Sequence, residues 1–501
     1  MDLVTPSLKF LSLIPETILT ATALLLALAA AVKLNLNMRI TGLIVILSIT
    51  ITGIMVFFTE PGVVGGDSFL NDAASPLFKY VFLIAAVCTA AMFLAVPKAS
   101  PTKSIISLSC LILSLVGMMF LSMSSSLLSL FVSLELCTLP LIFIFFLNTD
   151  DSDRIKTSHK FLLITSFSSL LILFGLSFLF GLSGALNFLL MKLQIAIVHL
   201  TNRQIGVTIL LSIAAILTGL LFRSGLIPFQ NWQRRLHHKL PLPIVAFLAT
   251  AFLIAIVLFF SKLFINGLFA FHGPEMNPND WGRLIGFVAF VNLLFGSIQL
   301  YRQNDLVDLM YYSNITQIGF ILTGLLAMNP TGLRGAGFYI IAFVLATLGA
   351  YGVIYVISNS SKSTSLDSSK GLQKSSLLAA ILLSIFLFSL AGLPLLAGFV
   401  AKFSVIEGAL QRAATDKTYH WMYLVSGGAA VAALVTIIKF FKIVFSFFST
   451  GEFPSLPFKI PFAVNMVLIA LAVVIIAFGI FPDPILSFAN RLPEAFGFTF
   501  E

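Results

Sequence analysis

Long apolar runs without charge are the feature that most constrains this chain. One of them, from Ser375 to Ala401, contains no Asp, Glu, Lys or Arg. A helix needs about 20 apolar residues to cross a bilayer, whereas a strand of a membrane barrel needs only about 10 alternating ones. In lipid, only a helix satisfies the backbone polar groups of so long a run. We therefore predict an all-α polytopic membrane protein with about 14 transmembrane helices.

The composition and the charge distribution also indicate a membrane protein. Hydrophobic residues make up 59% of the 501 residues and charged residues only 10%, against roughly 25% in soluble chains. The net charge of +9 does not indicate a nucleic-acid partner, because the basic residues stand singly or in short clusters between apolar runs. This distribution is typical of positive-inside topology, and its bias predicts that both termini lie on the outer side of the lipid membrane.

No cofactor-binding motif is present in the sequence. Cys88, Cys110 and Cys137 are widely separated, and no Cys-x-x-Cys occurs, so we expect no iron–sulfur or zinc site in this chain. Neither a Walker A sequence nor a Gly-x-Gly-x-x-Gly fingerprint in a nucleotide-binding context appears. We expect no metal or cofactor in this chain, and any redox chemistry must reside in partners.

Two predicted spans are interrupted by helix-breaking residues. These residues are Pro228 in the run 205–232, and Gly392, Pro394 and Gly398 in the run 376–402. Proline removes a helical hydrogen bond and clashes with the preceding turn. The two runs are the predicted seventh and twelfth spans. Interrupted helices at corresponding positions of two halves suggest a repeated transporter architecture.

Three ionisable residues within or beside the apolar runs suggest a proton path. Glu135 is the only acid of its run, and we expect Arg223 to face it, because an isolated charge in hydrocarbon needs a partner. Lys402 follows the second interruption. A desolvated lysine gives up its proton readily, whereas arginine keeps its proton in proteins. The alternatives are a fixed Glu135–Arg223 ion pair and a lysine that snorkels to the interface.

Four further charged residues are weaker candidates. Lys160 opens the predicted sixth span and is either part of the proton path or an interfacial anchor. The same alternatives hold for Lys79 and Lys262. Glu16 lies near one end of the first span and is interpreted as a helix-end group.

For polar and basic groups elsewhere, a structural role is an alternative to a role in the proton path. Thr316 and Gln317 lie mid-span, where they either hold water in the proton path or bond a neighbouring helix. The basic cluster QRRLHHK, residues 233–239, is predicted to be a cytoplasmic loop that helps to set the topology.

Several segments resemble a known family. The chain resembles subunit N of proton-translocating NADH-quinone oxidoreductase (complex I), one of the antiporter-like subunits shared with Mrp-type cation/proton antiporters. The resemblance covers most of the chain, and the segments that carry it are LIPETILTATALLLAL, LELCTLPL, FRSGLIPFQNW with LPLPIVAFLAT, DLMYYSNITQIGF, and SLAGLPLLAGFVAKF.

The resemblance implies a specific organisation. It implies two inverted five-helix repeats with broken helices 7 and 12, and a hydrated row of ionisable residues between two half-channels. The expected domains are three N-terminal helices at 1–103, a first repeat (helices 4–8) at 104–265, a second repeat (helices 9–13) at 283–448, and a C-terminal helix and tail at 449–501. Glu135 matches the family glutamate of span five, and Lys402 matches the family lysine that follows the second break.

The sequence departs from the family at three positions that usually titrate. Arg223 and Leu253 stand where the family has lysines, and Gln317 stands where it usually has a histidine. In addition, the loop that usually contains Asp-x-Tyr reads QRRLHHK. These replacements leave fewer groups along the row that can change protonation state.

The function implied by the resemblance is proton conduction by a membrane-arm subunit of a complex I-like assembly in the bacterial inner membrane. Its partners would be other membrane-arm subunits, with NADH, FMN, iron–sulfur clusters and quinone bound in partner subunits. One alternative is an Mrp-type antiporter or ion-uptake subunit. Another is a structural membrane-arm subunit that has lost pumping.

Overall fold

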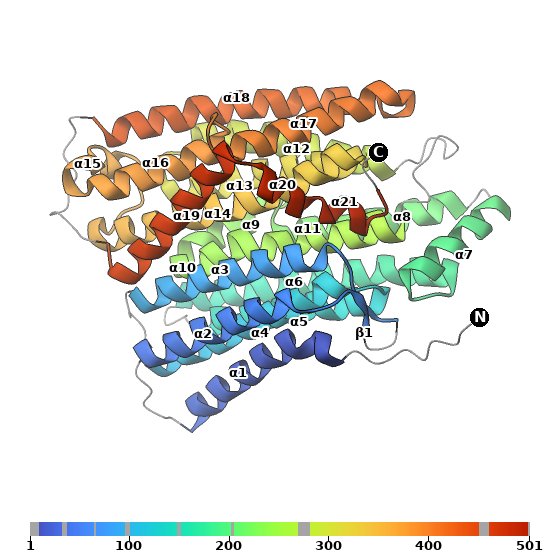
Figure 1. Ribbon diagram of the computed structural model, residues 1–501, viewed down its shortest axis with the longest axis horizontal. Helices are drawn as coiled ribbons and strands as arrows, with labels where there is room; N and C mark the ends of the chain where they lie inside the picture. Colours follow the sequence, from blue (N-terminus) through green and yellow to red (C-terminus); the bar gives the residue numbers. More distant parts are fainter. Residues whose placement is uncertain are drawn as a thin grey trace. The chain divides into compact units, whose positions relative to one another are not determined.

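The computed structural model describes residues 10–32, 38–64, 67–95, 101–147, 152–201, 205–268, 281–449 and 460–498. These residues are almost entirely helical, with one short β-hairpin (Figure 1). Twelve of the described helices are long and apolar enough to cross a membrane. The predicted all-helical membrane fold is therefore confirmed, while the count of about 14 spans stays a prediction.

The elements of the first half, in chain order, are η1 (Phe10–Leu13), α1 (Ile14–Ala31), α2 (Met38–Phe57), β1 (Gly62–Val64), β2 (Phe69–Asn71), α3 (Ser75–Ala95), α4 (Pro101–Met123), α5 (Leu127–Leu147), α6 (Ser152–Ser183), α7 (Phe188–Thr201), α8 (Ile205–Ser224), α9 (Gln230–Lys239), α10 (Leu242–Phe247), η2 (Leu248–Phe252), α11 (Leu253–Ser261) and η3 (Lys262–Gly267).

The elements of the second half are α12 (Trp281–Arg302), α13 (Leu306–Ala327), α14 (Pro330–Ser361), η5 (Asp367–Ser369), α15 (Leu372–Ser375), α16 (Leu377–Ala391), α17 (Ala397–Thr415), η6 (Lys417–Tyr419), α18 (Trp421–Phe447), α19 (Phe462–Ile480), α20 (Asp483–Ala489) and α21 (Arg491–Ala495).

The chain divides into two compact units. Unit 1 consists of Met1–Ala90, Pro97–Trp232 and Phe252–Gly282, and unit 2 consists of Ala91–Val96, Gln233–Ala251 and Arg283–Glu501.

In unit 1, α4 packs against α1 and α5, and α6 packs along α8. Glycines bring the last two helices into backbone contact. A Cβ on Gly175 would lie 2.6 Å from the carbonyl oxygen of Ser212, and a Cβ on Gly219 would lie 2.9 Å from that of Ser168. A larger residue at either glycine would push α6 and α8 apart, so these glycines fix the spacing of two helices that carry polar residues of the site.

In unit 2, α14 is the central helix. Its most apolar stretch is fully buried, and it packs against α13, α16, α17 and α19. A Cβ on Gly408 of α17 would lie 2.3 Å from the Cα of Gly332 of α14. Small residues of this kind let membrane helices approach closely. The contact fixes α17, the helix that carries Lys402, against the first turn of α14.

The helix from Leu242 to Gly267 contains two π-helical segments, η2 and η3. π-helical turns are rare and are frequently found at functional positions. The second segment begins at Lys262, whose side chain is buried.

One segment predicted to be a loop is helical. The basic cluster at 233–239 belongs to α9. In α9 the buried residues are Gln233, Leu236 and His237, which lie on one face at i, i+3 and i+4. That face makes α9 amphipathic, so the helix is stable despite its low overall hydropathy.

The segment between α2 and α3 contains the antiparallel hairpin β1–β2, in which Val63 pairs with Leu70.

Candidate functional site

An ion pair between α5 and α8 forms the first part of the site. The Oε1 atom of Glu135 lies 2.8 Å from Nη2 of Arg223. Arg223 is fully buried, whereas the side chain of Glu135 is 23% exposed. The pairing expected from the sequence is therefore present in unit 1.

Two residues of α6 and one of α5 complete the surroundings of this pair. The hydroxyl of Ser169 donates to Glu135 Oε1 at 2.8 Å and accepts a hydrogen bond from Arg223. The guanidinium also donates to the carbonyl oxygen of Thr165 at 3.3 Å and to the hydroxyl of Thr138 at 3.4 Å. Ser169 thus bonds both charged groups, and the sequence did not single it out because several serines surround it in α6.

The position of Arg223 follows from the interruption of its helix. The α8 helix ends at Ser224 and α9 begins at Gln230, so the chain leaves the helix around Pro228. A helix end leaves carbonyl groups without intrahelical partners. The indole of Trp232 donates to one of them, the carbonyl oxygen of Phe222, at 3.0 Å. A side chain of α9 thus satisfies a backbone carbonyl at the end of α8. Arg223 lies in the last turn of α8.

The second interruption, in unit 2, holds a lysine against the end of a helix. Nζ of Lys402 donates to the carbonyl oxygens of Leu390 and Ala391 at 2.7 and 2.9 Å. These carbonyls belong to the last turn of α16, where the helix dipole favours a cation. The ammonium also lies 4.6 Å from the ring centroid of Phe320 on α13, a cation–π distance. Lys402 is buried, so these groups replace its hydration shell.

Gly392 makes the approach of Lys402 possible. Its backbone adopts φ +88°, a conformation that L side chains rarely adopt, and a Cβ at this position would lie 2.8 Å from Cδ of Lys402. Both the backbone turn and the space for the lysine therefore require glycine at this position.

The polar pair predicted on the tenth span has one member that bonds other helices. Gln317 on α13 accepts a hydrogen bond from the hydroxyl of Tyr339 on α14 and donates to the carbonyl oxygen of Leu390 at 3.1 Å. Thr316 donates to the carbonyl oxygen of Tyr312 in its own helix at 3.0 Å. Gln317 and Lys402 thus share Leu390 as an acceptor, and Tyr339 is a member of the cluster that sequence reasoning missed.

Outside the membrane-spanning helices, α9 and the start of α13 form a charged cluster. Arg234 donates to both carboxylate oxygens of Asp308, at 2.8 and 2.6 Å. Nε2 of His238 lies 2.8 Å from Asp308, and this hydrogen bond raises the pKa of His238 above its usual value. Burial lowers the pKa of His237 to about 3. The ligand atoms of His238, Asp305 and Asp308 lie within 4.8 Å of one another, but a metal ion would have to displace Arg234.

Comparison with known protein families decides the family of this chain. Residues 124–426 match the family model described as "NADH:quinone oxidoreductase/Mrp antiporter, TM". The chain belongs to this antiporter family. The matched range includes Glu135, Arg223, Gln317 and Lys402, so both interrupted helices lie inside the family domain.

Curated relatives agree with this family. A protein named NADH-quinone oxidoreductase subunit N from Rhodococcus opacus (strain B4) is 32% identical over 380 residues, which is 75% of this chain and 67% of the relative. A protein of the same name from Desulforamulus reducens is 26% identical over 91% of this chain and 90% of the relative.

Among solved structures, a chain of respiratory complex I from Thermus thermophilus shares the fold with a TM-score of 0.76 at 20% identity, covering 95% of this chain and all of that one. A chain of the Mrp complex from Dietzia sp. DQ12-45-1b has a TM-score of 0.80 at 17% identity and covers 97% of this chain and 98% of that one.

Lys160 and Leu253 belong to neither of the two clusters described above. Lys160 is exposed near the start of α6. Leu253, which stands where the family resemblance implies a lysine, is 5% exposed at the start of α11 and contributes no polar group. Unit 1 therefore presents Glu135 and Arg223 at its break without a further cation from position 253.

Proposed function

We propose that this chain is a membrane-arm subunit of a proton-translocating NADH-quinone oxidoreductase and that it carries protons across the membrane. The support is its membership of the antiporter family and its similarity to relatives named subunit N. The observation that carries the proposal is the Glu135–Arg223 ion pair beside an interrupted membrane helix.

In this proposal Glu135 is the proton-carrying group of unit 1. Arginine keeps its proton in proteins, so Arg223 acts by its charge alone. A shift of Arg223 relative to the carboxylate changes how tightly Glu135 holds a proton, which loads or releases it. Ser169 bonds both groups and therefore responds to any such shift.

Lys402 is the proton-exchanging group of unit 2 in this proposal. Its ammonium is held by neutral carbonyl oxygens rather than by a carboxylate, so loss of its proton leaves no buried anion behind. Gln317, bonded to the same carbonyl of Leu390, links α13 to this site. Lys160 is assigned to the path only as a surface group, because its side chain is exposed.

The proposal includes the setting of the chain. It would lie in a bacterial inner membrane with both termini on the outer side, and the repeats at 104–265 and 283–448 would each carry one interrupted helix. NADH, FMN, iron–sulfur clusters and quinone would be bound by partner subunits, and other membrane-arm subunits would flank this one. The chain itself would be a non-redox subunit of the enzyme.

The main alternative is a cation/proton antiporter subunit, because the family description covers both kinds of protein. The curated relatives favour the first reading, since both of those compared are named as oxidoreductase subunits. A subunit that has lost pumping is the other alternative, and Arg223, Leu253 and Gln317 favour it.

Purification of the native assembly with identification of its subunits tests the proposal. Subunits that bind flavin, iron–sulfur clusters and quinone are expected to copurify with this chain. An assembly made only of small membrane subunits would contradict the oxidoreductase proposal and favour the antiporter. If the oxidoreductase is found, proton translocation by the Glu135→Gln assembly separates a pumping subunit from a structural one.

A further inference from the structure

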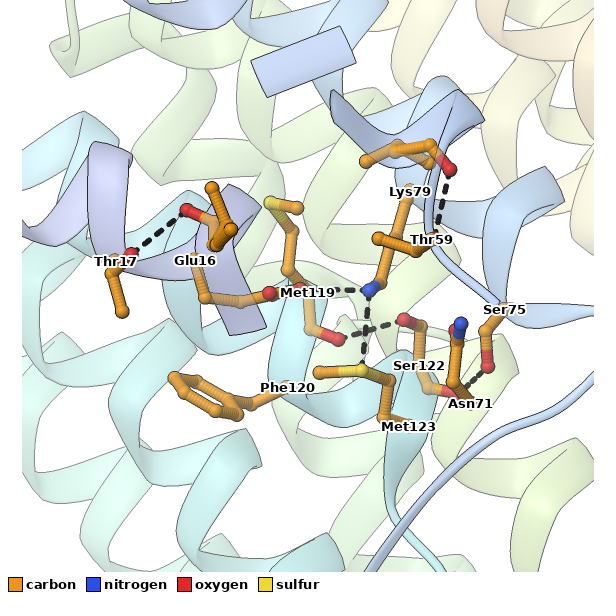
Figure 2. A network of polar contacts seen from close by, with 12 residues as sticks. Glu16, Thr17, Thr59, Asn71, Ser75, Lys79, Met119, Phe120, Ser122 and Met123 are labelled. Atoms are coloured by element: carbon orange, nitrogen blue, oxygen red, sulfur yellow. Dashed lines mark hydrogen bonds and ion pairs between the residues drawn. The ribbon is translucent and has the colours of Figure 1, made fainter. Parts of the chain in front are cut away.

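Unit 1 contains a second set of buried ionisable residues, apart from Glu135 and Arg223. It lies where the first turn of α1, the start of α3 and the end of α4 meet, and Figure 2 shows part of it. Its members form two ion pairs, Glu16 with Lys79 and Asp72 with Lys262. The function proposed above uses neither pair.

The Glu16–Lys79 pair is the more deeply buried. Nζ of Lys79 lies 2.8 Å from Oε1 of Glu16, and the two side chains are 0% and 1% exposed. Removing two charges from water costs several kcal/mol per ion, and the pair recovers this cost only if further hydrogen bonds satisfy both groups.

Those further hydrogen bonds are weak or missing. Within the described part of the chain, Oε2 of Glu16 has no hydrogen-bond partner, although a carboxylate accepts about four. The other bond of the Lys79 ammonium goes to the sulfur of Met123 at 3.1 Å, and a thioether is a weak acceptor (Figure 2). The ionised forms of both residues are therefore poorly satisfied. Transfer of one proton from the lysine to the carboxylate would remove both charges without moving any heavy atom.

A second ion pair lies between this site and the β1–β2 hairpin. Asp72, which follows β2, is bonded to Lys262, the first residue of the π-helical segment η3. Asp72 also accepts hydrogen bonds from the backbone N–H and the hydroxyl of Ser75, at 2.8 and 2.7 Å. Ser75 lies four residues before Lys79, one turn along α3, so the two residues share a helix face. The side chain of Asp72 is 10% exposed, so this end of the cluster is accessible from the surface of the chain.

Among the described residues, the one charged residue of α4 lies far from the Glu16–Lys79 pair. Helix α4 packs on α1, and its charged residue, Lys103, is in its first turn. Met123, which contacts Lys79, ends the same helix. About 20 helical residues span roughly 30 Å, so Lys103 cannot replace Lys79.

We propose that the Glu16–Lys79 pair is a second proton-binding site of this chain, loaded from the side of Asp72 and Lys262. In the loading step the N–H bond of Lys79 breaks and an O–H bond forms on Glu16, which leaves a neutral amine and a neutral acid. The amine then takes up a proton from the Asp72 side, and the pair carries one net positive charge. Release of the Glu16 proton restores the ion pair.

The cation distinguishes this site from the Glu135 site. Lysine can pass its proton to the acid, whereas arginine cannot. A purely structural ion pair needs only a positive charge beside Glu16, which arginine also supplies. The conservative variant Lys79→Arg therefore separates the two roles, because it keeps the charge and removes the exchange.

Difference infrared spectroscopy of the purified assembly tests the site directly. The C=O stretch of a protonated carboxylic acid is recorded while the pH is lowered, in the wild type and in Glu16→Gln, Lys79→Arg and Glu135→Gln. The wild type is expected to show a band from a buried acid. That band should be lost in Glu16→Gln and in Lys79→Arg and kept in Glu135→Gln.

Further variants keep the result interpretable. Glu16→Asp keeps an acid at the site and should shift the band rather than remove it. Lys370→Arg makes the same substitution in the exposed pair with Asp367 and should leave the band unchanged. The thermal unfolding midpoint of each variant shows whether the chain is folded.

Two outcomes overturn the proposal. One is that the wild type has no protonated-acid band that Glu16→Gln removes. The other is that folded Lys79→Arg keeps the band with the same pH dependence. The readout concerns this chain alone, so it stands or fails independently of whether the assembly reduces quinone.

Discussion

The two interrupted helices each place a cation beside the C-terminal end of a half-helix, but the partners differ. Arg223, in the last turn of α8, faces the carboxylate of Glu135. Lys402, in the second turn after the other break, reaches back to neutral carbonyl oxygens of α16. At the first break only the acid can change protonation state, and at the second only the base can. The difference teaches that one architecture can hold either half of an acid–base couple.

Removal of the acid at the first break should have the largest effect. We expect Glu135→Gln to lower proton translocation by at least about tenfold, because a positioned acid–base group typically contributes about 10²–10⁴-fold. Proton uptake by membrane vesicles that contain the assembly measures this. The control is Glu407→Gln, a carboxylate on α17 that accepts a hydrogen bond from Gln411, one turn along the same helix. Translocation in Glu135→Gln equal to that of the control would contradict the role of Glu135.

Exchange of the two cations sharpens the comparison. We expect Lys402→Arg to lower proton translocation several-fold, because a guanidinium cannot release its proton, and to destabilise the fold by about 1–3 kcal/mol through overpacking.

Arg223→Lys is the reciprocal change. It should retain translocation, since only the charge is needed there, and cost about 1.5–3 kcal/mol of stability through lost hydrogen bonds to the guanidinium. Vesicle assays and detergent unfolding measure the two effects. If Lys402→Arg translocated like the wild type while Arg223→Lys did not, the assignment of the two roles would be reversed.

A substitution in the second break tests the geometry that holds Lys402. Gly392→Ala should destabilise the chain by at least about 1–2 kcal/mol, the cost of a left-handed backbone for an L residue, before the clash with Lys402 is added. Gly427→Ala on α18 is the matched control, because nothing lies within 4 Å of its added Cβ. That control should gain about 0.5–1 kcal/mol, since alanine is the better helix residue. Equal unfolding midpoints of the two variants would contradict the strain at Gly392.

The smallest effect is expected at the cluster that follows the first break, where two adjacent histidines have opposite pH dependences. The pKa of His238 is raised, so its stabilising charge is complete below its ordinary value of 6.5 and is lost as the pH rises through the raised value. The pKa of His237 is lowered to about 3, so the stability of its neutral form is complete above 6.5 and is lost as the pH falls. The side chain of His238 is 40% exposed, which limits its share to about 0–1 kcal/mol.

Unfolding midpoints across pH test both signs. His238→Gln should flatten the alkaline loss, and His237→Phe should flatten the acid loss. A loss of the acid limb in His238→Gln would show that the two histidines are assigned the wrong way round.

The sequence predicted the class of the fold and one ion pair because neither depends on which way a side chain points around its helix. Apolar runs must be helices in lipid, and isolated charges at similar depth must meet, as Glu135 and Arg223 do. Depth in the membrane is readable from position in a run. The orientation of a side chain around its helix is not, because these runs are apolar on every face.

The parts that were missed depend on that orientation. Ser169 is one of several serines in α6, and only the close packing against α8 selects it. Glu16 was interpreted as a helix-end group and does lie in the first turn of α1, but its burial against Lys79 was not predicted. The α9 helix was predicted as a loop because its charged residues outweigh its three buried ones.

The contact between Gly332 and Gly408 has a mechanical consequence. Two main chains that touch leave no compressible side-chain layer between them, so a tilt of α17 cannot be absorbed locally. Helix α14 has 32 residues and therefore extends over roughly 48 Å. A displacement of α17 large enough to loosen the lysine from its carbonyls would therefore have to move α14 as well.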